Sequence, residues 1–305
     1  MIDSHYQETI RQLLRLYKNT PRCVLFFLAG TLPGAALIHI RQLNLFGMIC
    51  RLGQHSLLYQ HAKNFLTSVV CFKGSWFHQI RKWCLLYHLA HPSDLFEHPP
   101  PKEEFKRMVK KSVIQYWENV LRNEANNLKS LVFFKPQFMS LVNPHPLWKT
   151  AGHNPIQVSM ATVQASLLSG RYRCGALLRH WSSARETGYC KLSLSCSQVL
   201  EDVPHIIRWC PSLANVRHGL LDFTYRYSSN LPIELMSLIR SKCTPSSPTF
   251  VDFILDCSTD PNVIKITQEL GPDVLVHFFA VTRTWAFVIH RERSKMLRSW
   301  RATSY

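Results

Sequence analysis

The stretch GYCKLSLSCSQVLEDVPHIIRWCP, residues 188–211, decides how the second half of this chain is organised. It contains four potential metal ligands at spacings of x5, x8 and x4: Cys190, Cys196, His205 and Cys210. Three thiolates and one imidazole form a common ligand set for tetrahedral Zn²⁺, bound at about 2.0–2.3 Å. We therefore predict a structural zinc site at these residues, because four protein ligands leave no open position for water.

The local structure around these ligands can also be predicted. A loop would carry the first two cysteines, and a helix over 200–209 would present His205 and Cys210. Glu201 and Asp202 suit the first turn of that helix, where the helix dipole favours acidic groups. Because His205 and Cys210 are five residues apart, we expect the chain to bend near Trp209 so that both face inward. Residues 191–194 could form a small ribbon.

Two alternatives to this ligand set remain open. Cys174, His180 and His218 lie nearby and could each replace one of the four. The four could also be ordinary core residues, since the chain has ten cysteines, and reduced thiols in apolar runs behave as small hydrophobes. Their distribution does not resemble a disulfide framework, and the polar start does not resemble a secretion signal. We therefore expect a reducing, intracellular location, nuclear and/or cytoplasmic.

The charge of the chain indicates a polyanionic partner. Of 305 residues, 36 are Lys or Arg and 19 are Asp or Glu, which gives a net charge of +17. A basic surface binds RNA or DNA because each neutralised phosphate releases counterions. The basic residues are spread over segments that also look folded, which indicates a charged surface on a structured body. The apolar run 23–30 is too short to cross a bilayer and Arg283 interrupts 274–289, so we expect no membrane partner.

Apolar residues recur mostly at helical spacing, which predicts a mainly α fold. The clearest helix runs over 102–129, after three prolines that stop any preceding helix and with Glu103 and Glu104 in its first turn. Ser4 and Gln7 form a capping-box pattern for a first helix. Further helices are predicted over 35–51, 56–70 and 75–88. The expected architecture is a helical body, then a small Cys₃His zinc module, then C-terminal helices.

Proline-rich breaks divide the chain into three expected regions. The breaks at 141–155 and 243–248 separate a helical region 1–150, a zinc-containing region 151–242 and a C-terminal helical segment 243–305.

Basic and aromatic residues alternate beside the cysteine cluster and along the last predicted helix. Aromatic rings can stack on unpaired bases while arginines and lysines pair with phosphates. The candidate nucleic-acid contacts are Arg171, Tyr172, Arg173, Arg179, Trp181, Arg291, Lys295 and Arg298. The alternative is that Tyr172 and Trp181 belong to the core. A second basic set has the same two interpretations, phosphate contact or solvated face: Lys106, Arg107, Lys110 and Lys111.

Several blocks resemble the region that follows the reverse transcriptase palm in non-LTR (LINE-type) retrotransposon proteins. They are PGAALIHIRQLNLFGMI (33–49), FKPQFMS (134–140), NPHPLW (143–148), LSGRYR (168–173), FILDCS (253–258) and TRTW (282–285), together with the cysteine cluster. The similarity covers essentially the whole chain. It implies that region 1–150 is similar to the thumb and linker, and that the cysteines form the family's zinc-binding module. In the parent proteins such parts would hold template RNA and target DNA during target-primed reverse transcription.

The resemblance also indicates which activities to expect. The family's polymerase uses an Asp-Asp turn that holds two Mg²⁺ ions, and this chain has no Asp-Asp pair. The family's upstream endonuclease is absent as well. We therefore expect non-catalytic binding of RNA or DNA. Three alternatives are a protein–protein interaction module, a residual metal-dependent nuclease at Asp252, Asp256 and Asp260, and a degenerate remnant without a cellular role. The sequence leaves the oligomeric state open.

Overall fold

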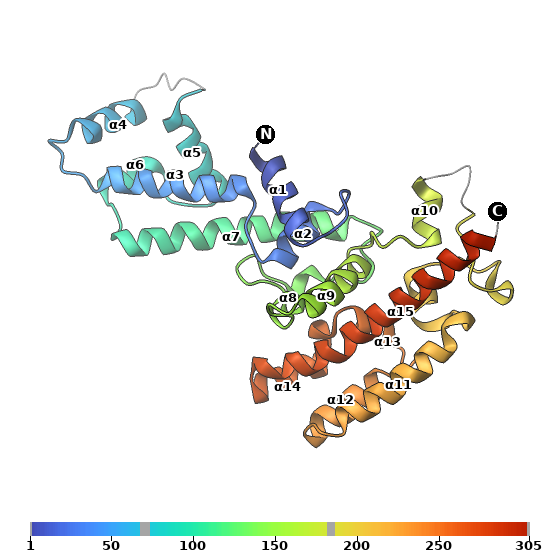
Figure 1. The fold of residues 1–305 in the computed structure, drawn as a ribbon. Coiled ribbons are helices and arrows are strands. Elements are labelled where there is room, and N and C mark those ends of the chain that lie inside the picture. The colour runs from blue at the N-terminus through green and yellow to red at the C-terminus, as the bar shows by residue number, and fades with distance from the viewer. Residues whose placement is uncertain (1, 68–73, 182–186, 304–305) are drawn as a thin grey trace.

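The computed structural model describes residues 2–67, 74–181 and 187–303, and in these ranges the chain is helical without named strands. The N-terminal half is built on two long helices, α3 and α7, that lie side by side (Figure 1). The remaining helices of this half pack around that pair. The elements are α1 (Ile2–Leu13), α2 (Arg22–Ala29), α3 (Gly34–Cys50), α4 (Leu57–Thr67), α5 (Trp76–Leu86), α6 (Pro92–Glu97) and α7 (Lys102–Asn126).

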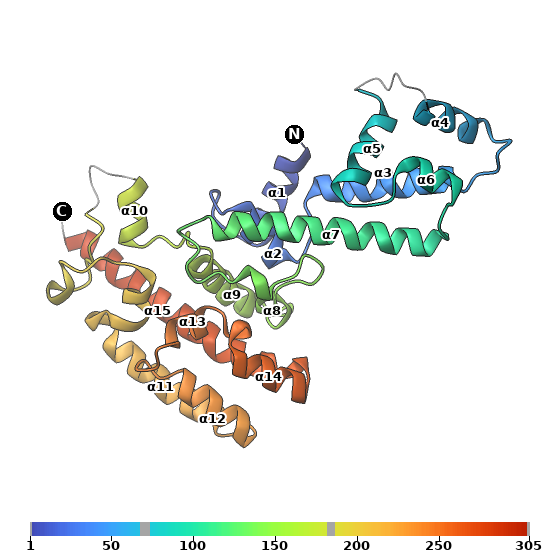
Figure 2. The ribbon, with the colours of Figure 1, turned by 180° about the vertical axis from the view of Figure 1, so that it is seen from behind.

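The C-terminal half is arranged around one long helix, α15, with α9 and α11 on opposite sides of it (Figures 1 and 2). Helix α9 also contacts α13, so residues on both sides of the break at 243–248 share one core. The elements are α8 (Pro146–Lys149), α9 (Pro155–Leu168), α10 (Gly175–Trp181), α11 (Ala214–Ser228), α12 (Ile233–Lys242), α13 (Phe250–Leu255), α14 (Pro261–Leu270) and α15 (Leu275–Thr303).

The starts of the helices follow from their capping residues. Asp260 accepts a hydrogen bond from the Asn262 N–H at 2.9 Å at the start of α14. Helix α3 is capped from outside, because Asp3 of α1 accepts from the Ala35 N–H at 3.0 Å. The predicted capping role of Ser4 is wrong, since Ser4 lies inside α1. Helix α1 already begins at Ile2, so Ser4 lies within its first turn, and Asp3 of the same turn caps α3 instead.

The close approach of α3 and α7 depends on one glycine. A Cβ at Gly47 would lie 2.2 Å from the Phe105 ring, so only glycine lets this buried ring pack directly on α3. Phe46 beside it is fully buried and meets Phe96 edge to face at 5.5 Å. The predicted mainly α class is therefore confirmed in both halves.

By length and composition alone, α15 could cross a membrane, and so could α2 and α3 taken as one span bent by 63°. Helix α15 is, however, the central packing helix of its half, and it carries two buried arginines, Arg283 and Arg293. Arg283 donates to the carbonyl of Leu147 at 3.1 Å and to the Thr150 hydroxyl at 3.0 Å. These contacts account for a charged residue in the middle of an apolar stretch.

Candidate metal centre

The structure brings Cys190, Cys196, His205 and Cys210 into one buried group. One ligand atom from each residue lies within 4.8 Å of the others. The Cys190 and Cys210 Sγ atoms are 3.9 Å apart. A tetrahedral ion with bonds of 2.3 Å would hold two sulfurs about 3.8 Å apart, whereas a disulfide would require about 2.05 Å. The arrangement fits a metal ion, and the predicted Cys₃His cluster is confirmed as a feature of the fold.

A single backbone bridge closes the loop that carries the first two cysteines. Tyr189 and Leu200 form an isolated antiparallel bridge, and the Glu201 N–H donates to the Gly188 carbonyl at 2.9 Å. The Cys190 N–H donates to the Val199 carbonyl at the same distance. The predicted ribbon over 191–194 is therefore wrong. The pairing occurs at the two ends of the loop, and the loop between them carries the first two ligands.

Of the other two ligands, His205 begins a π-helical turn, His205–Trp209, and Cys210 directly follows it. In an α-helix residues five apart point about 140° away from each other. Here the Cys210 N–H donates to the His205 carbonyl at 2.7 Å, a five-residue turn that returns both side chains to one side. The predicted helix over 200–209 begins too early, because Leu200 belongs to the bridge and not to the helix. The expected bend near Trp209 is replaced by this wider turn.

The thiols of the group shift each other's pKa values. The pKa of Cys210 falls to about 5, because the Cys190 thiol donates to its sulfur and His205 lies close by. The same hydrogen bond, with burial, raises the pKa of Cys190. His205 Nε2 is buried and has no hydrogen-bond partner among the described residues. Because buried polar atoms are nearly always paired, this unpaired nitrogen fits the role of a metal ligand.

None of the three alternative ligands joins the group. Cys174 is buried apart from it, and burial raises the pKa of its thiol. His180 and His218 are exposed on α10 and α11. Within residues 2–67, 74–181 and 187–303, the other cysteines are free, buried thiols. They fill the core as small hydrophobes.

Tyr172, a candidate for stacking on a nucleobase, is buried against α15. Its side chain is only 3% exposed, its hydroxyl lies 2.8 Å from His290 Nδ1, and the Arg293 guanidinium covers the ring at 5.4 Å. These contacts with α15 make Tyr172 a core residue, so its prediction as a base-stacking group is wrong. The side chain of Trp181 lies outside the described residues.

The basic candidates lie mainly at the surface. Arg173 and Arg179 are exposed, while Arg171 is half-buried. On α15, Arg291 and Lys295 are exposed and both contact Glu292, at 3.1 and 2.9 Å. These ion pairs neutralise part of the positive charge predicted along this helix. Arg298, further along α15, is exposed as well.

Aromatic residues that the sequence analysis did not select are exposed around the cysteine module. Tyr189 and Trp300 are each 41% exposed and Trp209 is 60% exposed. Lys191 Nζ lies 5.0 Å from the Trp300 ring centre, and the Arg208 guanidinium lies 4.2 Å from the Trp209 ring centre. Tyr189 and Trp209 each directly precede a ligand cysteine in the sequence, and this position could have identified them as surface residues of the site. Trp300 is far from the cysteines in the sequence, so no local signal indicated it.

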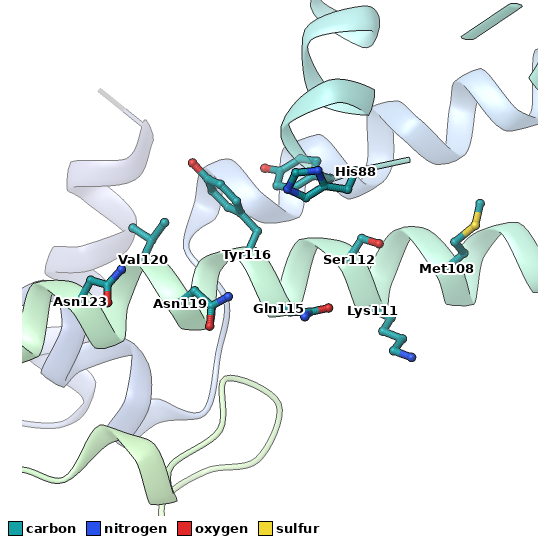
Figure 3. A pocket seen from close by; sticks show the side chains of 10 residues that line it. His88, Met108, Lys111, Ser112, Gln115, Tyr116, Asn119, Val120 and Asn123 are labelled. Atoms are coloured by element: carbon teal, nitrogen blue, oxygen red, sulfur yellow. The ribbon is translucent and has the colours of Figure 1, made fainter. Parts of the chain in front are cut away.

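A larger hollow, of about 750 Å³, lies far from the cysteines along α7 (Figure 3). Among the residues that the structure describes, its lining offers amides, aromatic rings and one lysine, and no carboxylate: Tyr87, His88, Met108, Lys111, Ser112, Gln115, Tyr116, Asn119, Val120 and Asn123. Arg107, Lys110 and Lys111 line an adjoining surface hollow together with Glu118, whose carboxylate pairs with Arg122 at 2.9 Å. Lys106 instead pairs with Glu103 at 3.1 Å. This side of α7 is basic and exposed.

The three aspartates of the alternative nuclease site each have a separate partner. Asp252 pairs with Lys135 at 2.8 Å and Asp260 pairs with Lys242 at 2.6 Å. Asp256 is buried against His145, with its carboxylate 3.2 Å from Nε2. The three do not form a cluster of potential metal ligands in the described ranges.

Comparison with known proteins gives no relative: no family model, no curated protein and no solved structure matches this chain. The fold and the cysteine group define the class of the protein. The chain is a mainly helical protein with a buried Cys₃His group that could hold a metal ion.

Proposed function

We propose that this chain is a non-catalytic RNA- or DNA-binding protein organised around a structural Zn²⁺ ion. The observation that carries the proposal is the buried Cys₃His group with its unpartnered His205 nitrogen. When bound, Zn²⁺ would cross-link the loop 190–199 to the π turn 205–209 and supply folding free energy. The four side chains would fill its tetrahedral shell, so the ion has no position for a reacting water.

Nucleic-acid binding is supported by charge and by the surface around this module. The chain carries a net charge of +17, and Lys191 lies over the exposed Trp300 ring beside the cysteine loop. Exposed rings beside cations are what single-stranded nucleic acid binds. Lys111 of the hollow on α7, with the neighbouring Arg107 and Lys110, extends the basic surface to the other half.

The resemblance to LINE-type retrotransposon proteins supports the same proposal. Three of the similar blocks meet in the interior. His145 of the block 143–148 contacts Asp256 of the block 253–258 at 3.2 Å. Arg283 of the block 282–285 donates to the Leu147 carbonyl at 3.1 Å. Short blocks that pack on one another are expected of a shared fold, and we infer that this chain corresponds to the post-palm thumb, linker and zinc-binding regions.

The test is the salt dependence of binding to labelled single-stranded RNA, single-stranded DNA and duplex DNA. We expect log K to fall linearly with log salt between about 50 and 200 mM, because phosphate contacts release counterions. A Lys110→Ala/Lys111→Ala variant, altered only at exposed positions, should reduce the slope. Absence of binding at low salt would contradict the proposal. Binding that is insensitive to salt would instead favour a protein partner.

A further inference from the structure

The surface beside the metal ligands contains a second, smaller hollow, of about 390 Å³, between the cysteine loop and the end of α15. A hollow of this size falls in the range of small-molecule binding pockets. Figure 1 shows the C-terminal end of α15 lying next to this loop. Its lining comprises Thr187, Tyr189, Cys190, Lys191, Leu192, Ser193, Leu194, Ser197 and Trp300. We propose that this hollow, called the loop pocket below, binds one unpaired nucleobase of a single-stranded nucleic acid.

The shape of the proposed ligand follows from the two aromatic rings. Tyr189 and Trp300 both line the loop pocket and both remain 41% exposed. Rings of this kind present apolar faces on which a flat, conjugated ligand can stack. Leu194 is 95% exposed at the same site and adds apolar contact area. A nucleobase is flat and large enough to cover such rings, and stacking is indifferent to which base is present.

The charge of the proposed ligand follows from the rest of the lining. Lys191 lies over the Trp300 ring, and the described residues that line the loop pocket include no carboxylate. A base attached to phosphates would place its negative charge near this ammonium group. A nucleic-acid strand offers both the flat base that suits the two rings and the negative charge that suits this lysine.

The hydroxyl groups that line the loop pocket form hydrogen bonds within the loop itself. Few of them therefore remain to form base-specific hydrogen bonds. The Ser197 hydroxyl donates to the Leu194 carbonyl at 2.9 Å, and the Thr187 hydroxyl accepts from the Tyr189 N–H at 3.3 Å. The Ser193 and Ser195 hydroxyls bond to each other at 2.7 Å. We therefore expect binding that depends on the presence of a base and little on its identity.

The loop pocket is connected to the candidate metal centre through Cys190. This ligand stands between Tyr189 and Lys191, so a metal ion that fixes its sulfur also fixes the backbone of both neighbours. Removal of the ion should therefore remove base binding before it unfolds the helical halves. This inference rests on the proposed nucleic-acid function, which it localises to one site.

The experiment compares two strands of about ten nucleotides, a length typical of single-strand sites. One is a fluorescein-labelled oligothymidylate or oligouridylate, and the other is an abasic strand with the same number of phosphates. We expect the wild-type protein to bind the base-bearing strand at least about fivefold more tightly, the lower limit for one base stack. Trp300→Ala should abolish this preference, whereas Trp300→Phe, which keeps a ring, should retain most of it.

Trp209→Ala is the matched control, because Trp209 is an exposed tryptophan of the same module that does not line the loop pocket. Circular dichroism and zinc content should be unchanged in all three variants. Equal weakening of both strands by Trp300→Ala, or loss of the preference in Trp209→Ala, would overturn the loop-pocket proposal alone. Failure of the wild-type protein to bind any strand would overturn the nucleic-acid function as well. The DNA and RNA arms identify the source of the base.

Discussion

Arg293 on α15 forms a buried, two-point ion pair with Glu201, which directly follows the bridge that closes the cysteine loop. Its Nε lies 3.0 Å from Oε1, and a terminal nitrogen lies 2.7 Å from Oε2. Glu201 also accepts from the Gly175 N–H at 2.7 Å. Burial acts to lower the pKa of Arg293, but Glu201 outweighs it and raises that pKa. This pair joins the cysteine module and the start of α10 to the central helix.

Replacing Glu201 with alanine should destabilise the fold by about 3–5 kcal/mol, because it leaves the buried Arg293 charge without its partner. Urea unfolding measures the change. Lys295→Ala is the control, since it removes an exposed partner of Glu292 and should cost less than about 1 kcal/mol. Equal effects of the two substitutions would show that the buried pair does not anchor the module.

Acid sensitivity should depend on Asp256. Burial acts to raise the pKa of this carboxyl, but His145 and two hydrogen bonds from Ser258 hold it below its usual range. A depressed folded-state pKa contributes stability that is present above the unfolded value of about 4 and is lost as the pH falls through the folded value. Asp256→Asn should therefore flatten the pH dependence of the unfolding free energy below about pH 4.

Asp222→Asn is the matched control for that pH series, because Asp222 is exposed on α11. It should leave the acid limb unchanged. An Asp256→Asn protein whose stability still falls as steeply in acid as the wild type would contradict the assignment.

Chelation should expose thiols selectively. With a metal bound, the three ligand cysteines are protected both by burial and by coordination. Without the metal, Cys210 should react first, because its pKa of about 5 makes it a thiolate near neutral pH. Addition of a chelator should release three thiols that react with a maleimide faster than the remaining buried cysteines. Mass spectrometry of the labelled peptides identifies them. Labelling that is unaffected by the chelator, or that starts at Cys243 in the core, would contradict this prediction.

Alanine substitutions at Gly30 and Gly152 distinguish the backbone strain of an added Cβ from its steric clash with neighbouring atoms. Both have positive φ, 61° and 58°, but a Cβ at Gly30 would lie 2.0 Å from the Asn143 backbone, while Gly152 has open space. Gly152→Ala should cost about 1–2 kcal/mol for the left-handed backbone alone. Gly30→Ala should cost several kcal/mol more, because α2 and the 143–144 backbone must separate. Thermal unfolding of both variants would reveal the difference, and similar melting temperatures would be inconsistent with this packing.

Local signals in the sequence predicted much of the fold. Three prolines and two glutamates placed the start of α7 at Lys102, where the structure has it, and only its last turn was predicted too long. The ligand spacing predicted the Cys₃His group. The π turn could not be predicted, because its hydrogen-bond pattern satisfies a tertiary requirement that both His205 and Cys210 face the other ligands. Likewise, Tyr172 is buried by residues of α15, which no local pattern indicates.

The measurement that tests the central claim most directly is the zinc content of purified protein, by inductively coupled plasma mass spectrometry. We predict about one Zn²⁺ per chain, lost in Cys190→Ser/Cys210→Ser and retained in Cys174→Ser, whose thiol lies outside the group. A folded wild-type protein without zinc, or a double variant that keeps it, would contradict the Cys₃His metal centre.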